Sequence, residues 1–171
     1  NSVFLDSNVS FIVRNNGTIL RSTDCGTGWT AVNTGYSNNF HSVYIMRDNY
    51  QKCWITGDNG LILKSTNAGL NWIQVPSGTT ANLKSFHSVG SGFSSGFSYG
   101  KYIICGNSGT ALVSRDSGST WSISQTNVNT DLNGTDDSYI VGNSGTILRW
   151  DVDSSYYFKK LEGNNISSFF T

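Results

Sequence analysis

Few side chains in this sequence could support catalysis, and their spacing matches no recognisable catalytic pattern. The only glutamate is Glu162, so an acid–base carboxylate pair would need aspartates, and no aspartate pair stands out. No serine stands in a pattern with a histidine and an aspartate, which argues against nucleophilic catalysis. We therefore expect a protein that is not an enzyme.

The two histidines, His41 and His87, occur in the same tetrapeptide, Phe-His-Ser-Val, at 40–43 and 86–89. If adjacent repeats aligned them, two imidazoles could share a ligand. Repeated structural use of the histidine is the favoured interpretation.

An oxygen-rich segment at 131–137 could bind calcium, because it gathers three aspartates and an asparagine around a glycine. The spacing fits no established calcium loop, however, and a solvated turn is the better interpretation. No metal and no cofactor are predicted. The residues concerned are Asp131, Asn133, Asp136 and Asp137.

The composition excludes several classes of protein. The 171 residues include 11 basic and 11 acidic side chains, and only 13% are charged, about half the usual share. A neutral chain has no bulk attraction for nucleic acid or anionic lipid. Aromatic residues make up 13%, which argues against disorder, and no apolar run is long enough to span a membrane.

The strongest signal is a four-fold internal repeat. The segments align on Gly17, Gly60, Gly109 and Gly145, each preceded by a short apolar run. They read RNNGTILRSTDCGTGW, GDNGLILKSTNAGLNW, GNSGTALVSRDSGSTW and GNSGTILRWDVDSSYY.

The elements that carry these segments are predicted to be short strands. Runs of four to six β-branched and aromatic residues alternate with Asn-Gly and Ser-Gly turns, and no helical periodicity appears. Four strands per unit predict an all-β array of about four β-propeller blades, as a small ring or a partial propeller. A linear β-solenoid is the alternative. We expect one domain, 1–171, with units near 1–39, 40–85, 86–130 and 131–165 and a fifth element beginning at 166–171.

Three repeats share the motif Ser-x-Asp/Asn-x-Gly-x-x-Trp. The Asp or Asn side chain can bond backbone N–H groups of the turn, the glycine adopts a conformation that other residues avoid, and the Trp packs between sheets. These residues are Ser22, Asp24, Gly26 and Trp29; Ser65, Asn67, Gly69 and Trp72; and Ser114, Asp116, Gly118 and Trp121.

The motif resembles the Asp-box, or bacterial neuraminidase repeat, of β-propellers. The longer pattern is most similar to the repeats of photosystem II stability/assembly factors and their secreted bacterial relatives. The fourth repeat departs from it, with Trp150, Asp151 and Tyr157 at the motif positions. In the family the boxes are structural hairpins away from catalytic centres, so the resemblance implies a folding role.

The arginine cluster of a sialidase is not evident. Arg21 and Arg149 occupy equivalent repeat positions with Lys64 between them, which is repetition and not a carboxylate-binding triad. The segment at 11–14 only faintly resembles the arginine motif of sialidases.

The segment at 90–100 is the most individual, because it lies where the repeat spacing stretches. Its aromatic residues could stack on a sugar or contact a neighbouring subunit. The alternative is a flexible Gly/Ser hairpin. The candidate partner-binding residues are Phe93, Phe97 and Tyr99.

The two ends of the chain resemble each other. The segment at 2–5 matches 42–45, and 166–170 could be the same element again. Strand exchange between molecules would then give a head-to-tail polymer.

The cysteines and sequons bear on location. Cys25, Cys53 and Cys105 allow one disulfide, but three buried thiols are favoured. The chain begins without methionine, so we expect a processed protein, a fragment or a stretch of a longer chain. Low charge and four sequons, at Asn8, Asn16, Asn133 and Asn165, favour an extracellular or cell-surface location.

We therefore predict a non-enzymatic extracellular structural or protein-interaction module, in particular a self-assembling surface or filament subunit. One alternative is a glycan-binding module or part of a sialidase-like or xyloglucanase-like glycoside hydrolase. Another is an assembly chaperone of a membrane complex. Protein subunits are the expected partners, and glycans are second.

Overall fold

The described residues form four four-stranded antiparallel sheets, which confirms the predicted all-β fold. The computed structural model describes residues 2–4, 9–46, 51–89, 101–136, 138–150 and 158–161. In chain order the sheets contain β1 (Ser2–Phe4), β2 (Ser10–Val13), β3 (Ile19–Ser22) and β4 (Thr30–Val32); β5 (Phe40–Ile45), β6 (Cys53–Gly57), β7 (Ile62–Ser65) and β8 (Ile73–Gln74); β9 (Leu83–Val89), β10 (Lys101–Gly106), β11 (Ala111–Ser114) and β12 (Ser122–Ser124); and β13 (Leu132–Thr135), β14 (Tyr139–Gly142), β15 (Ile147–Trp150) and β16 (Phe158–Lys160). We call them sheets A to D.

Each sheet is a meander whose strands pair in sequence order. The tight turn between its second and third strands places two consecutive residues at positive φ, the requirement of a type I′ hairpin. These pairs are Asn16–Gly17, Asn59–Gly60, Ser108–Gly109 and Ser144–Gly145. In sheet B the turn includes a short 3₁₀ segment, η1 (Asp58–Gly60). The Asn-Gly and Ser-Gly steps of the repeat therefore set the hairpins.

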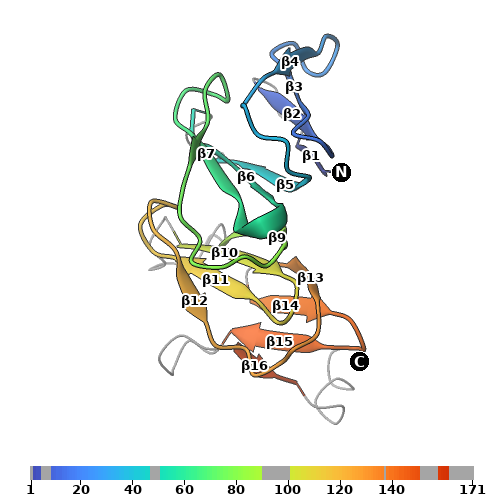
Figure 1. Cartoon of the computed structure of the whole chain (residues 1–171), viewed down its shortest axis with the longest axis vertical. Coiled ribbons are helices and arrows are strands. Elements are labelled where there is room, and N and C mark those ends of the chain that lie inside the picture. The colour runs from blue at the N-terminus through green and yellow to red at the C-terminus, as the bar shows by residue number, and fades with distance from the viewer. Residues whose placement is uncertain are drawn as a thin grey trace.

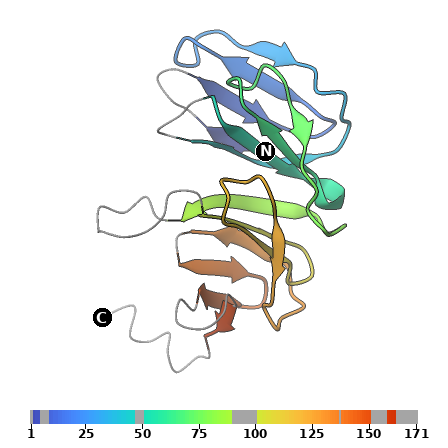
Figure 2. The same cartoon turned by 90° about the vertical axis from the view of Figure 1, so that its left-hand side faces the viewer.

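The four sheets follow one another as the blades of a partial β-propeller do (Figure 1). The first strands β1, β5, β9 and β13 contact one another in chain order, and the labelled last strands β4, β12 and β16 lie farther out, toward the top, the left and the bottom of Figure 1. The view in Figure 2 shows the sheets stacked along the long axis. The first strands therefore form the inner side of the array.

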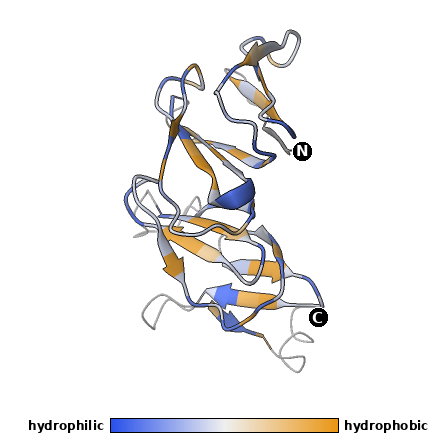
Figure 3. Ribbon diagram, in the orientation of Figure 1, coloured by the Kyte–Doolittle hydropathy of each residue, from blue (hydrophilic) through white to orange (hydrophobic). Residues whose placement is uncertain are grey.

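Apolar side chains fill the spaces between successive sheets. One buried cluster lies between sheets A and B, a second between B and C and a third between C and D. Both faces of sheets B and C are therefore buried, which explains the nearly continuous apolar runs of β6 and β10 (Figure 3). None of the helical turns in the described part of the chain has the length and apolar character that a membrane span needs.

Candidate functional site

The first strands of sheets B, C and D each contain a β-bulge near the start. The residue that the ladder skips is His41 in β5, Lys84 in β9 and Asn133 in β13. A bulge re-aims the extra side chain out of the regular ladder. Three polar side chains thus occupy equivalent places on three adjacent strands.

This register shows that the match between the two histidines is wrong. The structural counterpart of His41 is Lys84, whereas His87 pairs with Ile103 farther along β9. The repeated Phe-His-Ser-Val tetrapeptide is out of phase with the structural repeat, because the turn glycines and not the tetrapeptide set the register.

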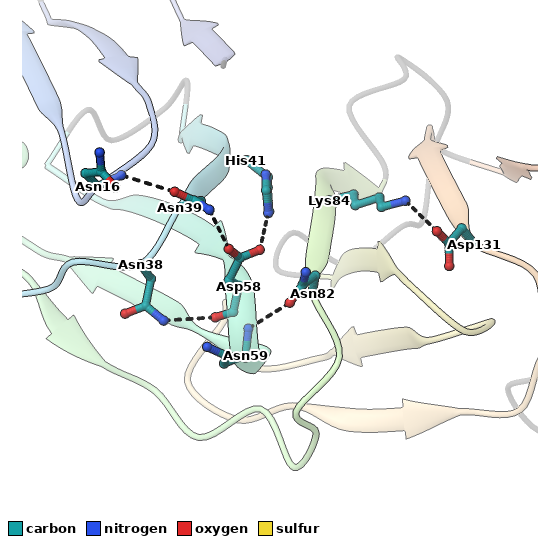
Figure 4. Close-up of polar contacts among 9 residues, drawn as sticks. All are labelled: Asn16, Asn38, Asn39, His41, Asp58, Asn59, Asn82, Lys84 and Asp131. Carbon is teal, nitrogen blue, oxygen red and sulfur yellow. Dashed lines mark hydrogen bonds and ion pairs between the residues drawn. The ribbon is translucent and has the colours of Figure 1, made fainter.

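The bulged residues belong to a larger group of polar side chains that we call the inner rim, most of which Figure 4 shows. Its other members come from the residue before each first strand and from the hairpin turns. The inner rim consists of Asn39, His41, Asp58, Asn82, Lys84, Asp131, Asn133 and Asn143.

In sheet B the inner rim is organised around the carboxylate of Asp58. The His41 Nε2 atom lies 2.7 Å from Asp58 Oδ1, and Asn39 Nδ2 donates to Asp58 Oδ2 at 2.8 Å. The side chains of His41 and Asp58 are 29% and 20% exposed, so solvent only partly screens this contact. Both carboxylate oxygens are engaged, which holds the imidazole in one orientation (Figure 4).

Between sheets C and D the inner rim contains an ion pair. Lys84 Nζ lies 3.1 Å from Asp131 Oδ2 and 2.9 Å from Asn133 Oδ1, so this lysine joins β9 to the start of the next sheet. The pKa of Asp131 is lowered, first by the hydrogen bond from the backbone N–H of Ser108 and then by Lys84. Asp131 is therefore an anion over the physiological pH range.

Lys84 makes sheet C the exception among the three. In sheets B and D the bulged residue contacts the first residue of its own hairpin turn, as Asn133 Nδ2 does with Asn143 Oδ1 at 2.7 Å. Lys84 reaches to sheet D instead, and the corresponding turn residue, Asn107, has a buried Oδ1 with no hydrogen-bond partner in the described residues. An unsatisfied buried acceptor costs about 1–3 kcal/mol. Local rules of this kind are broken most often at functional sites.

A second set of hydrogen bonds connects the residue before each first strand to the hairpin turn of the preceding sheet. The side-chain oxygen before each first strand accepts from the backbone N–H of the positive-φ residue in the preceding hairpin turn. These donor–acceptor pairs are Asn16 with Asn39 at 3.2 Å, Asn59 with Asn82 at 3.0 Å and Ser108 with Asp131 at 3.0 Å. The inner rim is therefore a preorganised polar surface.

The twelve motif residues predicted from the Asp-box lie away from the inner rim, at the end of each third strand and in the turn that follows it. In the first box Ser22 Oγ donates to Asp24 Oδ1 at 2.6 Å and accepts from Gly26 N at 2.9 Å. Ser65 with Asn67 and Gly69, and Ser114 with Asp116 and Gly118, repeat this geometry. The indole nitrogens of Trp29 and Trp72 donate to the box glycine carbonyls.

The third Asp-box differs at its tryptophan. Trp121 Nε1 is buried without a hydrogen-bond partner in the part of the chain that the structure describes. The carbonyl of Gly118, which would accept this bond, faces Trp54 Nε1 of the preceding sheet at 3.5 Å. Trp121 packs edge-on against Phe86 instead.

The remaining predicted positions are the cysteines, the sequons and the loop residues. The expectation of three buried thiols is wrong for Cys25, which is exposed because it occupies the tip of a box turn, whereas Cys53 and Cys105 are buried. The sequon residues Asn16 and Asn133 are exposed. The loop residues Phe93, Phe97 and Tyr99, the sequons Asn8 and Asn165, Glu162 and the segment 166–170 lie outside the described residues.

The segment predicted to be a turn or a calcium loop is a strand start and a hairpin. Asp131 bonds Lys84, and Asp136 Oδ1 accepts from the backbone N–H groups of Ser138 and Tyr139. Asp137 lies outside the described residues. Within the described ranges no three His, Cys, Asp or Glu side chains gather as a metal site would require.

Sequence reasoning did not single out the inner rim, although its signal is present. An Asn or Asp, a large apolar residue and a polar residue recur at the start of the first strand in sheets B, C and D, as Asn39-Phe40-His41, Asn82-Leu83-Lys84 and Asp131-Leu132-Asn133. An alignment anchored on the turn glycines brings the three tripeptides into register. What this surface offers chemically is a row of hydrogen-bond donors and acceptors with one cation, which suits a polar or peptide ligand.

Comparison with known proteins identifies a matching family profile and similar solved structures. The family profile described as "Photosynthesis system II assembly factor YCF48" matches residues 2–83. No curated protein matches the chain in sequence. The structure "YCF48 bound to D1 peptide" has a TM-score of 0.69 and 19% identity over 96% of this chain and 55% of that one.

Two further solved structures are similar. YCF48 from Cyanidioschyzon merolae has a TM-score of 0.63 and 15% identity, over 95% of this chain and 58% of that one. The GH74 enzyme of Niastella koreensis has a TM-score of 0.70 and 19% identity, over 93% of this chain and 29% of that one. The chain therefore spans just over half the length of the YCF48 structures. At these identities the likeness to GH74 shows the fold alone.

The fold and the repeated boxes define a BNR-type β-propeller repeat protein. Among the proteins of that class, the chain resembles the photosystem II assembly factor YCF48, as its motifs predicted.

Proposed function

We propose that this chain is a non-enzymatic, peptide-binding module of the assembly-factor type, and that the inner rim binds the peptide. Three findings support the proposal: the match of residues 2–83 to the YCF48 profile, the similarity to a YCF48 structure bound to a D1 peptide, and the polar surface across adjacent first strands. These comparisons favour the assembly-factor alternative over an extracellular structural module or filament, for which they give no support.

The main observation behind the proposal is that Lys84 contacts the next sheet, whereas the equivalent residues of sheets B and D contact their own hairpin turns. The lysine leaves its own turn residue, Asn107, with a buried oxygen that no described group bonds, and it spans sheets C and D instead. A half-buried ammonium group between two sheets can also donate to a ligand carboxylate or carbonyl. The arrangement is more consistent with recognition than with stability.

The proposal is tested by titrating the purified chain with a synthetic D1 peptide and measuring fluorescence anisotropy. Loss of a charge-assisted hydrogen bond in Lys84→Ala should weaken binding about 10-fold or more. Lys101→Ala is the matched control, because Lys101 lies at the opposite end of β9 and β10 and should bind like the wild type. Lys84→Arg should recover part of the affinity.

A wild-type chain that does not bind the D1 peptide, or a Lys84→Ala variant that binds with unchanged affinity, would contradict the proposal. Incubation of the same preparation with xyloglucan and with a sialoside tests the glycoside hydrolase alternative. We expect no sugar release from either substrate.

A further inference from the structure

In sheets A and B, the face turned toward the next sheet carries a recurring pair of side chains. Phe11 and Arg21 are cross-strand partners in sheet A, and Trp54 and Lys64 are their counterparts in sheet B. In sheet B the Lys64 Nζ atom lies 5.6 Å from the centroid of the Trp54 ring. We call each of these an aromatic–cation pair.

The cation of each pair binds the Asp-box turn of the following sheet. Arg21 Nε donates to the carbonyl oxygen of Ala68 at 2.7 Å, and Lys64 Nζ donates to that of Ser117 at 3.3 Å. Ala68 and Ser117 are equivalent, since each precedes the box glycine and has positive φ. The contact therefore recurs between sheets A and B and between sheets B and C.

The aromatic ring of each pair packs against the box glycine itself. A Cβ atom on Gly69 would lie 2.2 Å from Phe11 Cζ, and one on Gly118 would lie 2.3 Å from Trp54 Nε1. Only glycine allows this approach. The aromatic–cation pair is therefore a recognition surface for an Asp-box turn.

At the boundary between sheets C and D, sheet C has no aromatic–cation pair and sheet D has no Asp-box. Ile103 and Val113 occupy its register positions, and both are buried against sheet D. In sheet D, Trp150 stands where the box serine would be. The pair and the box thus occur together twice and are absent together once.

Sheet D presents the pair again, on its outward face. Tyr139 and Arg149 are cross-strand partners at the same register, with Tyr139 half-buried and Arg149 exposed. Beside them Val141 is 49% exposed, whereas its counterparts Val13 and Cys105 are completely buried. The outward face of sheet D therefore has the residues that bind a box turn.

Sheet A presents the complementary surface at the other end of the molecule. Cys25 and Gly26 of its Asp-box have positive φ, as do the equivalent residues of the two box turns that are bound between sheets A and B and between sheets B and C. Its Asp24 is an exposed anion that complements Arg149. On the same side Ile12 and Leu20 are half-buried, while the equivalent residues of sheets B, C and D are completely buried.

We propose that a second copy of this chain binds the outward face of sheet D through the Asp-box face of its sheet A. The contact would repeat an interface that the chain already forms twice between its own sheets. When two copies make it reciprocally, eight sheets close into one ring, which lies within the usual range of about four to eight blades. A heterologous contact that closes in this way gives a defined dimer and no filament.

The test is the mass of the 171-residue chain in solution, measured by sedimentation velocity over a concentration series up to about 100 µM. We expect a particle of twice the 18.6 kDa chain. Arg149→Glu should place a carboxylate against Asp24 of the second copy and weaken the dimer at least 10-fold. Val141→Asp tests the apolar part of the same face.

Lys101→Glu is the matched charge-reversal control, because Lys101 lies at the start of β10 in sheet C, which contributes to neither face. It should dimerise like the wild type. Circular dichroism shows whether each variant keeps its fold. The proposal is overturned if the wild type is monomeric throughout the series, if it forms an assembly of another size, or if Arg149→Glu and Val141→Asp leave dimerisation unchanged.

Discussion

The third residue of the Asp-box accepts similar backbone hydrogen bonds whether it is a charged aspartate or a neutral asparagine. Asp116 accepts from the backbone N–H groups of Ser119 and Thr120 at 3.0 and 2.8 Å and from Thr120 Oγ1 at 2.6 Å. Asn67 accepts from Asn71 N at 2.9 Å in the same way, but it cannot titrate. The two turns therefore have the same shape and differ in their response to pH.

We predict that Asp116 makes the protein sensitive to acid. Burial would raise its pKa, but the hydrogen bonds from Thr120, Ser114 and Ser119 outweigh it and lower the pKa to about 2. Because this value lies below the pKa in the unfolded chain, the stabilisation is present above about pH 4 and is lost as the pH falls toward about 2. Urea unfolding of the wild type and Asp116→Asn at about pH 7 and about pH 2.5 measures the difference.

The sequence supplies a reciprocal control for this prediction. Asn67→Asp should introduce the same acid sensitivity in the second box, while Asp116→Asn should reduce it in the third. A variant Asp116→Asn that loses as much stability in acid as the wild type would show that other carboxylates carry the pH dependence.

The exposed cysteine should react with thiol reagents much faster than the two buried ones. Burial is the main cause that raises the pKa values of Cys53 and Cys105 to about 12 each, so neither forms a thiolate at neutral pH. Cys25 is exposed. We expect an aromatic disulfide reagent to label about one thiol per chain at concentrations where the chain is monomeric, and the other two only after unfolding. Rapid labelling of all three thiols in the folded protein would contradict this assignment.

At the scale of the elements, the hairpins could be predicted and the bulges could not. Consecutive Asn-Gly or Ser-Gly residues after an apolar run specify a type I′ turn locally, so four sheets follow from the sequence. A one-residue bulge depends on how two strands pair, and His41 is identified as the skipped residue of β5 only by its register with β6. Sequence analysis missed the inner rim because its members come from three different sheets and are brought together only by folding.

Two of the turn glycines form a matched pair for a stability prediction. In the β6–β7 hairpin a Cβ on Gly60 would lie 1.9 Å from the carbonyl oxygen of Thr79, whereas around Gly145 in the β14–β15 hairpin the space is open. Both have positive φ, at 68° and 66°. Gly145→Ala should therefore cost only the backbone strain, about 1–2 kcal/mol.

Gly60→Ala should lower the free energy of unfolding by at least twice as much, because the backbone of Thr79 must also move. Urea denaturation of the two variants gives the comparison. Equal losses would mean that the loop around Thr79 yields without cost, and that the close approach does not hold the turn in place.

At the scale of the molecule, the described strands form a row of sheets in which successive sheets pack against each other. Three separate apolar clusters lie between them, and no buried cluster in the described residues joins sheet A to sheet C or D. In such an array stability is a sum of sheet and interface contributions. Damage at one boundary should therefore stay near that boundary.

Phe11→Ala tests this directly, because Phe11 is completely buried between sheets A and B, where it contacts Trp72 with ring centroids 5.9 Å apart. Removing a buried phenyl ring costs about 3–5 kcal/mol. Hydrogen exchange measured by mass spectrometry should show faster exchange in β2 to β4 and little change in sheets C and D. Phe158→Ala, at the third boundary, is the mirror-image control and should loosen sheet D while sheet A keeps its protection. Faster exchange in all four sheets with either variant would show instead that the array unfolds as one cooperative unit, so that the contacts between sheets transmit stability along its whole length.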